Sequence, residues 1–148
     1  MALSDTINAE IKAAMLAKDQ AKLAALRAVK SALLLAQTES SNKEVSEAEE
    51  MKILQKLVKQ RNDAAAIYRE QNREDLAKDE EQQAEVIASF LPKQMSEDEI
   101  KQAVEKIIAD TGASSMADMG KVMGIASKQL AGKADGKVIS TIVKSLLG

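Results

Sequence analysis

Apolar side chains recur every three or four residues along almost the whole chain. Near the N-terminus, Leu3, Ile7, Ile11 and Met15 stand four residues apart. This spacing places side chains on one face of an α-helix, and no stretch alternates apolar and polar residues as a strand would. The pattern predicts seven helices, at about residues 4–18, 23–38, 47–71, 73–90, 97–110, 115–130 and 136–147, with residues 39–44 as a loop.

The clearest boundary in this pattern lies at Pro92, the only proline of the chain. Proline lacks a backbone N–H and disfavours helical geometry at the residue before it. Four residues later, Ser96 and Glu99 have the spacing of a capping box, in which each side chain accepts a hydrogen bond from the other residue's backbone N–H. We therefore predict an all-α protein with two domains, a four-helix domain at residues 1–92 and a three-helix bundle at residues 93–148.

Shorter signals mark the ends of individual helices. Ser46 and Glu49 have the spacing of another capping box, before the third helix. Gly112 and Gly132 are predicted to stop helices, because glycine adopts the left-handed backbone conformation that commonly follows a helix. Asp135 is predicted to cap the last helix.

The composition narrows the possible chemistry. Of the 148 residues, 45% are apolar, but only Tyr68 and Phe90 are aromatic, and the formal net charge is −2. The absence of histidine and cysteine excludes zinc sites of the usual kind, disulfides and catalytic triads built on either residue. The chain also lacks a long apolar run and a calcium-loop motif. The sequence therefore predicts a cytoplasmic protein without a membrane segment, metal, cofactor or catalytic activity of its own.

The helix predicted at residues 115–130 carries two distinct stripes. One contains the apolar residues that we expect to face the core: Met116, Met119, Met123, Ala126 and Leu130. The other contains only small residues: Gly120, Gly124, Ser127 and Ala131. Glycine inside a helix costs about 1 kcal/mol relative to alanine, so two such glycines call for a packing or contact reason.

Lysines accompany the small-residue stripe, and two interpretations remain open. In the first, a phosphate–sugar backbone approaches the small residues while the lysines neutralise its charge. That interpretation defines a candidate RNA-binding surface made of Gly120, Lys121, Gly124, Lys128, Lys133 and Lys137. In the second, the small residues allow tight packing of the last three helices, and the lysines are solvated. The residues alone favour packing.

The third and fourth helices are also rich in charge. The cations of the third helix are predicted to be solvated and to pair along the helix with Glu49, Asp63 and Glu70. The acidic residues at 75–85 are expected on the exposed side of the fourth helix rather than in a metal site. For the cations of the third helix, nucleic-acid binding is the weaker alternative to a solvated face.

Several spaced motifs together resemble those of the YqeY-like family (GatB/YqeY). The motifs are Asn72-Arg73-x-Asp75-Leu76-Ala77, Phe90-Leu91-Pro92-x-Gln94-Met95-Ser96-x-x-Glu99, Gly112-Ala113-x-Ser115, Asp118–Gly124 and Gly132-Lys133-Ala134-Asp135-Gly136. They occur in order and span most of the chain. The C-terminal part is similar to the tail domain of the GatB component of the glutamine-dependent tRNA amidotransferase, a helical module that contacts tRNA.

The resemblance implies a tail-like C-terminal domain and makes tRNA, or another structured RNA, the expected partner. It carries no catalysis over, because the parts of the amidotransferase that act as a carbon–nitrogen ligase are absent. Two residues depart from the pattern: Phe90 stands where the family usually has tyrosine, and Gly136 where the tail often has proline. We expect a non-catalytic RNA-binding module. The alternative is a protein–protein adaptor or homo-oligomer that binds no RNA.

Overall fold

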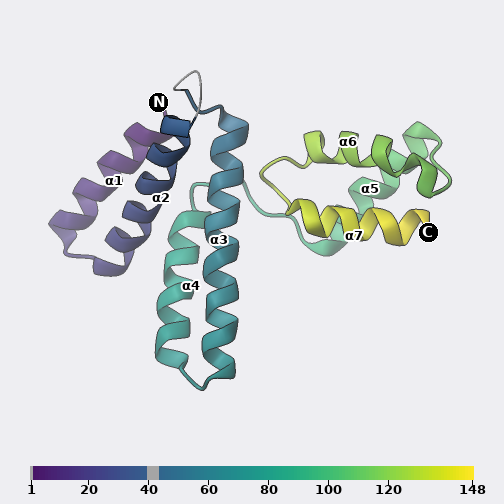
Figure 1. The fold of residues 1–148 in the computed structure, drawn as a ribbon. Helices are drawn as coiled ribbons and strands as arrows, with labels where there is room; N and C mark the ends of the chain where they lie inside the picture. The colour runs from purple at the N-terminus through teal and green to yellow at the C-terminus, as the bar shows by residue number, and fades with distance from the viewer. Residues whose placement is uncertain (1, 40–43) are drawn as a thin grey trace. The chain divides into compact units, whose positions relative to one another are not determined.

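The computed structural model describes residues 2–39 and 44–148. Every regular element in these ranges is helical (Figure 1), which confirms the all-α prediction. The elements are α1 (Leu3–Ala17), α2 (Gln20–Glu39), α3 (Glu47–Glu70), α4 (Glu74–Ala88), α5 (Glu97–Thr111), a 3₁₀ turn η1 (Met116–Asp118), α6 (Met119–Gln129) and α7 (Gly136–Leu147). Most of the loop predicted at residues 39–44 lies outside the described residues, and Glu39 is still helical.

The helices divide into two compact units, Met1–Leu91 and Pro92–Gly148. Each unit has its own hydrophobic core. The largest side chains buried in the first core are Ile7, Leu26, Val29, Leu54 and Ile87, and those in the second are Val104, Val122, Ile139 and Val143. Independent folding of the two units stays a prediction.

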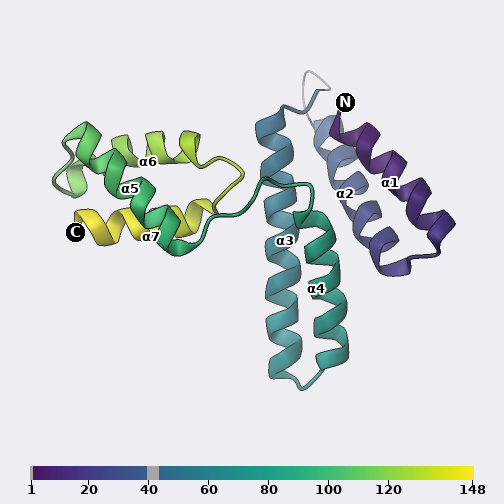
Figure 2. The same ribbon diagram turned by 180° about the vertical axis from the view of Figure 1, so that it is seen from behind.

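In the first unit, α2 is the central helix. It packs against α1, α3 and α4, while α3 and α4 lie side by side as a long antiparallel hairpin (Figures 1 and 2). Its central place follows from the sequence, because its buried residues occupy a broad face: Leu23, Ala25, Leu26, Val29 and Leu33.

The far end of the α3–α4 hairpin is held by charged groups. The ion pairs of Arg69 run across to Glu74 of α4 (3.0 Å) and to Glu81, rather than along α3 as the sequence predicts. The reason is the turn at Asn72, whose left-handed φ of 60° brings α4 back alongside α3. The hydrogen bond from Arg69 lowers the pKa of Glu81 below its ordinary value.

In the second unit, α5, α6 and α7 surround one core, and one predicted core residue is wrong. Met116 is 46% exposed, while Val122, which the predicted stripe omits, is fully buried. The cause is that η1 precedes the α-helix, which begins only at Met119. The N–H of Ser114, just before η1, donates to a carboxylate oxygen of Asp118 (3.0 Å). Met116 therefore belongs to the short turn before α6 and not to the α-helix whose apolar spacing predicted its burial.

Both predicted capping boxes are present. The Ser46 hydroxyl accepts a hydrogen bond from the N–H of Glu49, and the Ser96 hydroxyl accepts one from the N–H of Glu99, each at 3.2 Å. In return, the Glu99 carboxylate accepts from the N–H of Ser96 (3.2 Å), which lowers the pKa of Glu99 below its ordinary value of 4.5. These local bonds fix where α3 and α5 begin.

Candidate nucleic-acid interface

The geometry of α6 decides which of its stripes faces the core. Val122 and Ala126 are fully buried against α5 and α7, and Met119 and Met123 pack at the edge of the same core. At 100° per residue, the small-residue stripe then lies on the flank of the helix. All four of its members are exposed: Gly120, Gly124, Ser127 and Ala131.

The tight-packing interpretation of these glycines is wrong within the second unit. A Cβ atom added at Gly120 or Gly124 would meet no heavy atom within 4 Å outside the local helix backbone. Neither residue has a positive φ, so the backbone does not require glycine either. The unit therefore contains two glycines that weaken α6 without any internal structural benefit.

The four candidate lysines are all exposed: Lys121, Lys128, Lys133 and Lys137. None of them forms an ion pair with an acidic side chain in the part of the chain that the structure describes, where the ion pairs belong to the first unit. Lys121 and Lys128 are seven residues apart, which places them on one side of α6 about 10 Å from each other along the axis. Lys133 and Lys137 lie on either side of the start of α7.

In the turn between α6 and α7, Asp135 caps α7 as predicted, whereas α6 ends at Gln129 with Leu130, not Gly132, as its C-cap. Gly132 has a φ of 76°, in the region that favours glycine, and Asp135 accepts a hydrogen bond from the N–H of Lys137 (3.0 Å). The N–H of Lys133 donates to the carbonyl of Leu130 (3.0 Å), continuing the end of α6. These bonds fix the backbone that carries Lys133 and Lys137.

Sequence reasoning missed two residues of this region. Gln94 lies 38 residues before Gly132, yet its side-chain amide donates to the Gly132 carbonyl (2.7 Å). Lys144 follows Lys137 by seven residues, so the two exposed lysines share one face of α7. The spacing of Lys144 was visible in the sequence, whereas the contact of Gln94 depends on the fold.

The open surroundings of Gly124 lead to a stability prediction. Replacing Gly124 by alanine is expected to raise the free energy of unfolding of the second unit by about 0.5–1 kcal/mol, because alanine favours the helix and meets no neighbour. Urea denaturation followed by circular dichroism measures this. Gly112→Ala is the matched control, since its surroundings are equally open but its φ is 70°. That variant is expected to lose about 1 kcal/mol, and a loss for Gly124→Ala would contradict the prediction.

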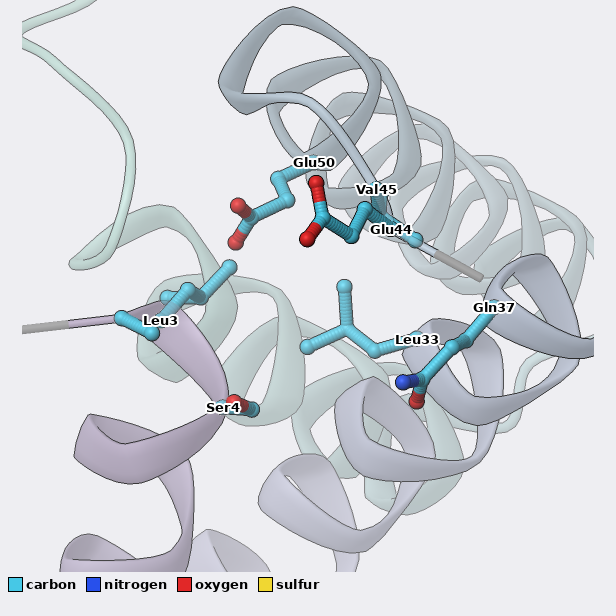
Figure 3. A pocket seen from close by; sticks show the side chains of 8 residues that line it. Leu3, Ser4, Leu33, Gln37, Glu44, Val45 and Glu50 are labelled. Carbon is cyan, nitrogen blue, oxygen red and sulfur yellow. The ribbon is translucent and has the colours of Figure 1, made fainter. Parts of the chain in front are cut away.

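The first unit contains a cavity of about 300 Å³ between the start of α1, the end of α2 and the start of α3. Figure 3 shows Leu3, Leu33, Glu44 and Glu50 reaching toward this space. Partial burial, and next the neighbouring charge of Glu47, raises the pKa of Glu50 above its ordinary value. None of the candidate lysines lines this cavity.

Residues 2–39 and 44–148 contain neither a metal-binding cluster nor a membrane span. No group of three or more acidic side chains is arranged to hold a metal ion among these residues. Within the same ranges, each helix is too short or too polar to span a lipid bilayer.

Comparison with known proteins gives one family. A family model described as "Yqey-like protein" matches residues 4–147. The chain is also similar to proteins named "Altered inheritance of mitochondria protein 41, mitochondrial". The one from Vanderwaltozyma polyspora is 35% identical over 103 residues, which cover 68% of this chain and 56% of that protein.

Two further relatives carry the same name. The protein of Clavispora lusitaniae is 30% identical over 115 residues, which cover 76% of this chain and 66% of that protein. The protein of Kluyveromyces lactis is 29% identical over 139 residues, which cover 92% and 71% respectively. The matched regions thus leave 44%, 34% and 29% of the three relatives outside the comparison, in the order given.

Proposed function

This chain belongs to the YqeY-like family, and from that premise we propose that it is a non-catalytic module that binds structured RNA, above all tRNA. The binding surface is the exposed side of α6 and the start of α7. Gly120 and Gly124 allow the phosphate–sugar backbone to approach α6. Lys121 and Lys128 flank that approach, and Lys133 and Lys137 extend it to the turn.

One observation carries this proposal. Gly120 and Gly124 are exposed and have open space around them, although each makes α6 less stable than alanine would. The missing reason for glycine would be a partner that approaches α6 more closely than a methyl group would allow. The four lysines are exposed and form no ion pair among the described residues, so a polyanion is the partner whose charge matches this surface.

The composition supports a structured rather than an unpaired RNA. The only aromatic residues are Tyr68 and Phe90, so residues 92–148 offer no ring on which an unpaired base could stack. Recognition would then depend on phosphates and on the shape of a folded RNA. The similarity to the amidotransferase tail makes tRNA the first candidate.

The proposal of a non-catalytic module is supported by what the sequence offers for chemistry. The chain has no histidine and no cysteine, and no charged side chain among the described residues is buried. The candidate surface holds amines and small residues, which bind anions but include no paired acid and base.

The direct test measures binding of the purified protein to tRNA by fluorescence anisotropy at several salt concentrations. We expect the logarithm of the affinity to fall linearly with the logarithm of salt, with a slope of about −3 to −4 for four phosphate contacts. An unstructured RNA of the same length should bind more weakly. Absence of tRNA binding at about 50 mM salt would refute the proposal.

The Gly124→Ala variant separates the proposal from general effects on folding. The added methyl group should lower RNA affinity because it blocks the close approach, even though the same variant is expected to be more stable. Unchanged affinity would remove Gly124 from the proposed surface.

A protein–protein adaptor or homo-oligomer is the second candidate, and the first unit carries its supporting observation. Large apolar side chains are exposed on α1 and α2: Met15, Leu16, Leu34 and Leu35. Exposed apolar groups are a common feature of protein interfaces. Light scattering at low and high salt distinguishes this function, since a stable dimer that persists at high salt and does not bind tRNA would support it.

A further inference from the structure

The side chain of Gln94 joins two motifs that are distant in sequence. Its Nε2 donates to the carbonyl of Pro92 (2.8 Å) and to the carbonyl of Gly132 (2.7 Å). A glutamine amide has two N–H donors, so both are used. The segment before α5 and the turn before α7 are thereby linked through one side chain.

The next residue repeats the connection through the backbone. The N–H of Met95 donates to the carbonyl of Lys133 (2.9 Å). Two successive carbonyls of the turn, at Gly132 and Lys133, are therefore held by two successive residues of the segment before α5. Such a pair of bonds fixes the orientation of a peptide unit more tightly than either bond alone.

This turn needs external partners because of its place in the fold. Gly132 and Lys133 lie beyond the end of α6 at Gln129, so no helix supplies donors for their carbonyls, and Gly132 is buried with a left-handed φ of 76°. Leaving this partly buried carbonyl without its hydrogen bond costs free energy, so the Gln94 amide favours this one conformation of the turn. The turn carries Lys133 and leads directly to Lys137.

We propose that Gln94 is a positioning residue for the RNA-binding surface: by clamping the Gly132–Lys133 peptide, it directs Lys133 toward an RNA phosphate. This inference rests on the proposed function. Without the clamp, the turn samples other conformations, and binding must order it again. The clamp thus contributes to affinity although Gln94 itself need not contact RNA.

The test compares Gln94→Met with Lys133→Ala and with the double variant, in the full-length protein and with tRNA as the probe. Methionine keeps the length of glutamine but has no N–H donor. We expect Gln94→Met and Lys133→Ala each to weaken affinity about 3- to 10-fold and to reduce the salt slope by about one. In the Lys133→Ala background, Gln94→Met should have no further effect on the slope, because both changes remove the same phosphate contact.

Gln102→Met is the matched control, since Gln102 is an exposed glutamine on α5, in the same unit. It should leave affinity and slope unchanged. The inference would be overturned if Gln94→Met had the same salt slope as the unchanged protein. It would also be overturned if the double variant changed the salt slope by the sum of the two single changes. If the unchanged protein itself binds no tRNA, the proposed function fails and this inference fails with it. If the unchanged protein binds tRNA but Gln94→Met has the same salt slope, only this inference fails.

Amide hydrogen exchange supplies a readout that does not involve RNA. Removal of the clamp should speed exchange at the N–H of Met95, which donates to Lys133, while the N–H of Val104 in the core of α5 stays protected. Equal exchange at Met95 in Gln94→Met and in the unchanged protein would show that the clamp does not hold the turn, and would overturn the inference.

Discussion

Replacing the four candidate lysines by glutamate should abolish tRNA binding, with a loss of affinity of about 100-fold or more at low salt. The variant carries Lys121→Glu, Lys128→Glu, Lys133→Glu and Lys137→Glu. Each change removes one cation that neutralises a phosphate and adds an anion that repels it. All four residues are exposed and form no described ion pair, so the helices should remain folded. Gel shift measures the binding, and circular dichroism measures the helix content.

A matched control separates a local effect from net charge. Reversing four other exposed lysines, Lys12, Lys18, Lys101 and Lys106, changes the formal net charge by the same amount. If this control loses as much affinity as the candidate variant, binding follows the total charge of the protein and the assignment of the surface is wrong. If the candidate variant binds tRNA as well as the unchanged protein does, the assignment of the surface is also wrong.

Replacing Ile139 by alanine should unfold the second unit alone. Ile139 is buried at the centre of that core, and an isoleucine-to-alanine change in a core costs about 2–5 kcal/mol. A unit as small as Pro92–Gly148 has only a few kcal/mol of stability, because small domains bury a smaller fraction of their surface. Two-dimensional NMR should show signals of residues 92–148 collapsing while those of the first unit stay in place.

The control for this variant is Ile142→Ala on the same helix. Ile142 is only partly buried, so the loss should be about 1 kcal/mol and the unit should remain folded. Simultaneous loss of both sets of signals in Ile139→Ala would show that the two units fold as one. Retention of both sets would show that Ile139 is not essential to the second core.

The sequence predicted best those features that depend on neighbouring residues. The helices follow from the spacing of apolar residues, and Ser46, Ser96 and Asp135 cap the expected helices because their partners lie two or three residues away. Gly112 stops α5 for a similarly local reason, its left-handed φ of 70°. Such contacts need no knowledge of the tertiary fold.

Features that depend on tertiary contacts were beyond the sequence. The helical period allowed two stripes on α6, and only the position of α5 and α7 shows that Gly124 faces solvent. Met116 was misplaced because α6 begins only at Met119, so the α-helical spacing does not extend back to residue 116. The bond from Gln94 to Gly132 joins residues 38 positions apart, and no local pattern indicates it. Whether the candidate surface binds RNA stays a prediction.

The composition of the α3–α4 hairpin has a consequence for how the chain can vary in length. Toward the tip, its buried residues are alanines, Ala65 and Ala77, and the large core side chains Leu54 and Ile87 lie toward the other end. Removing or adding one matched turn in each helix near the tip would leave those side chains in place. We therefore expect the first core to tolerate matched insertions and deletions near the tip of the hairpin, provided that they preserve the helical register.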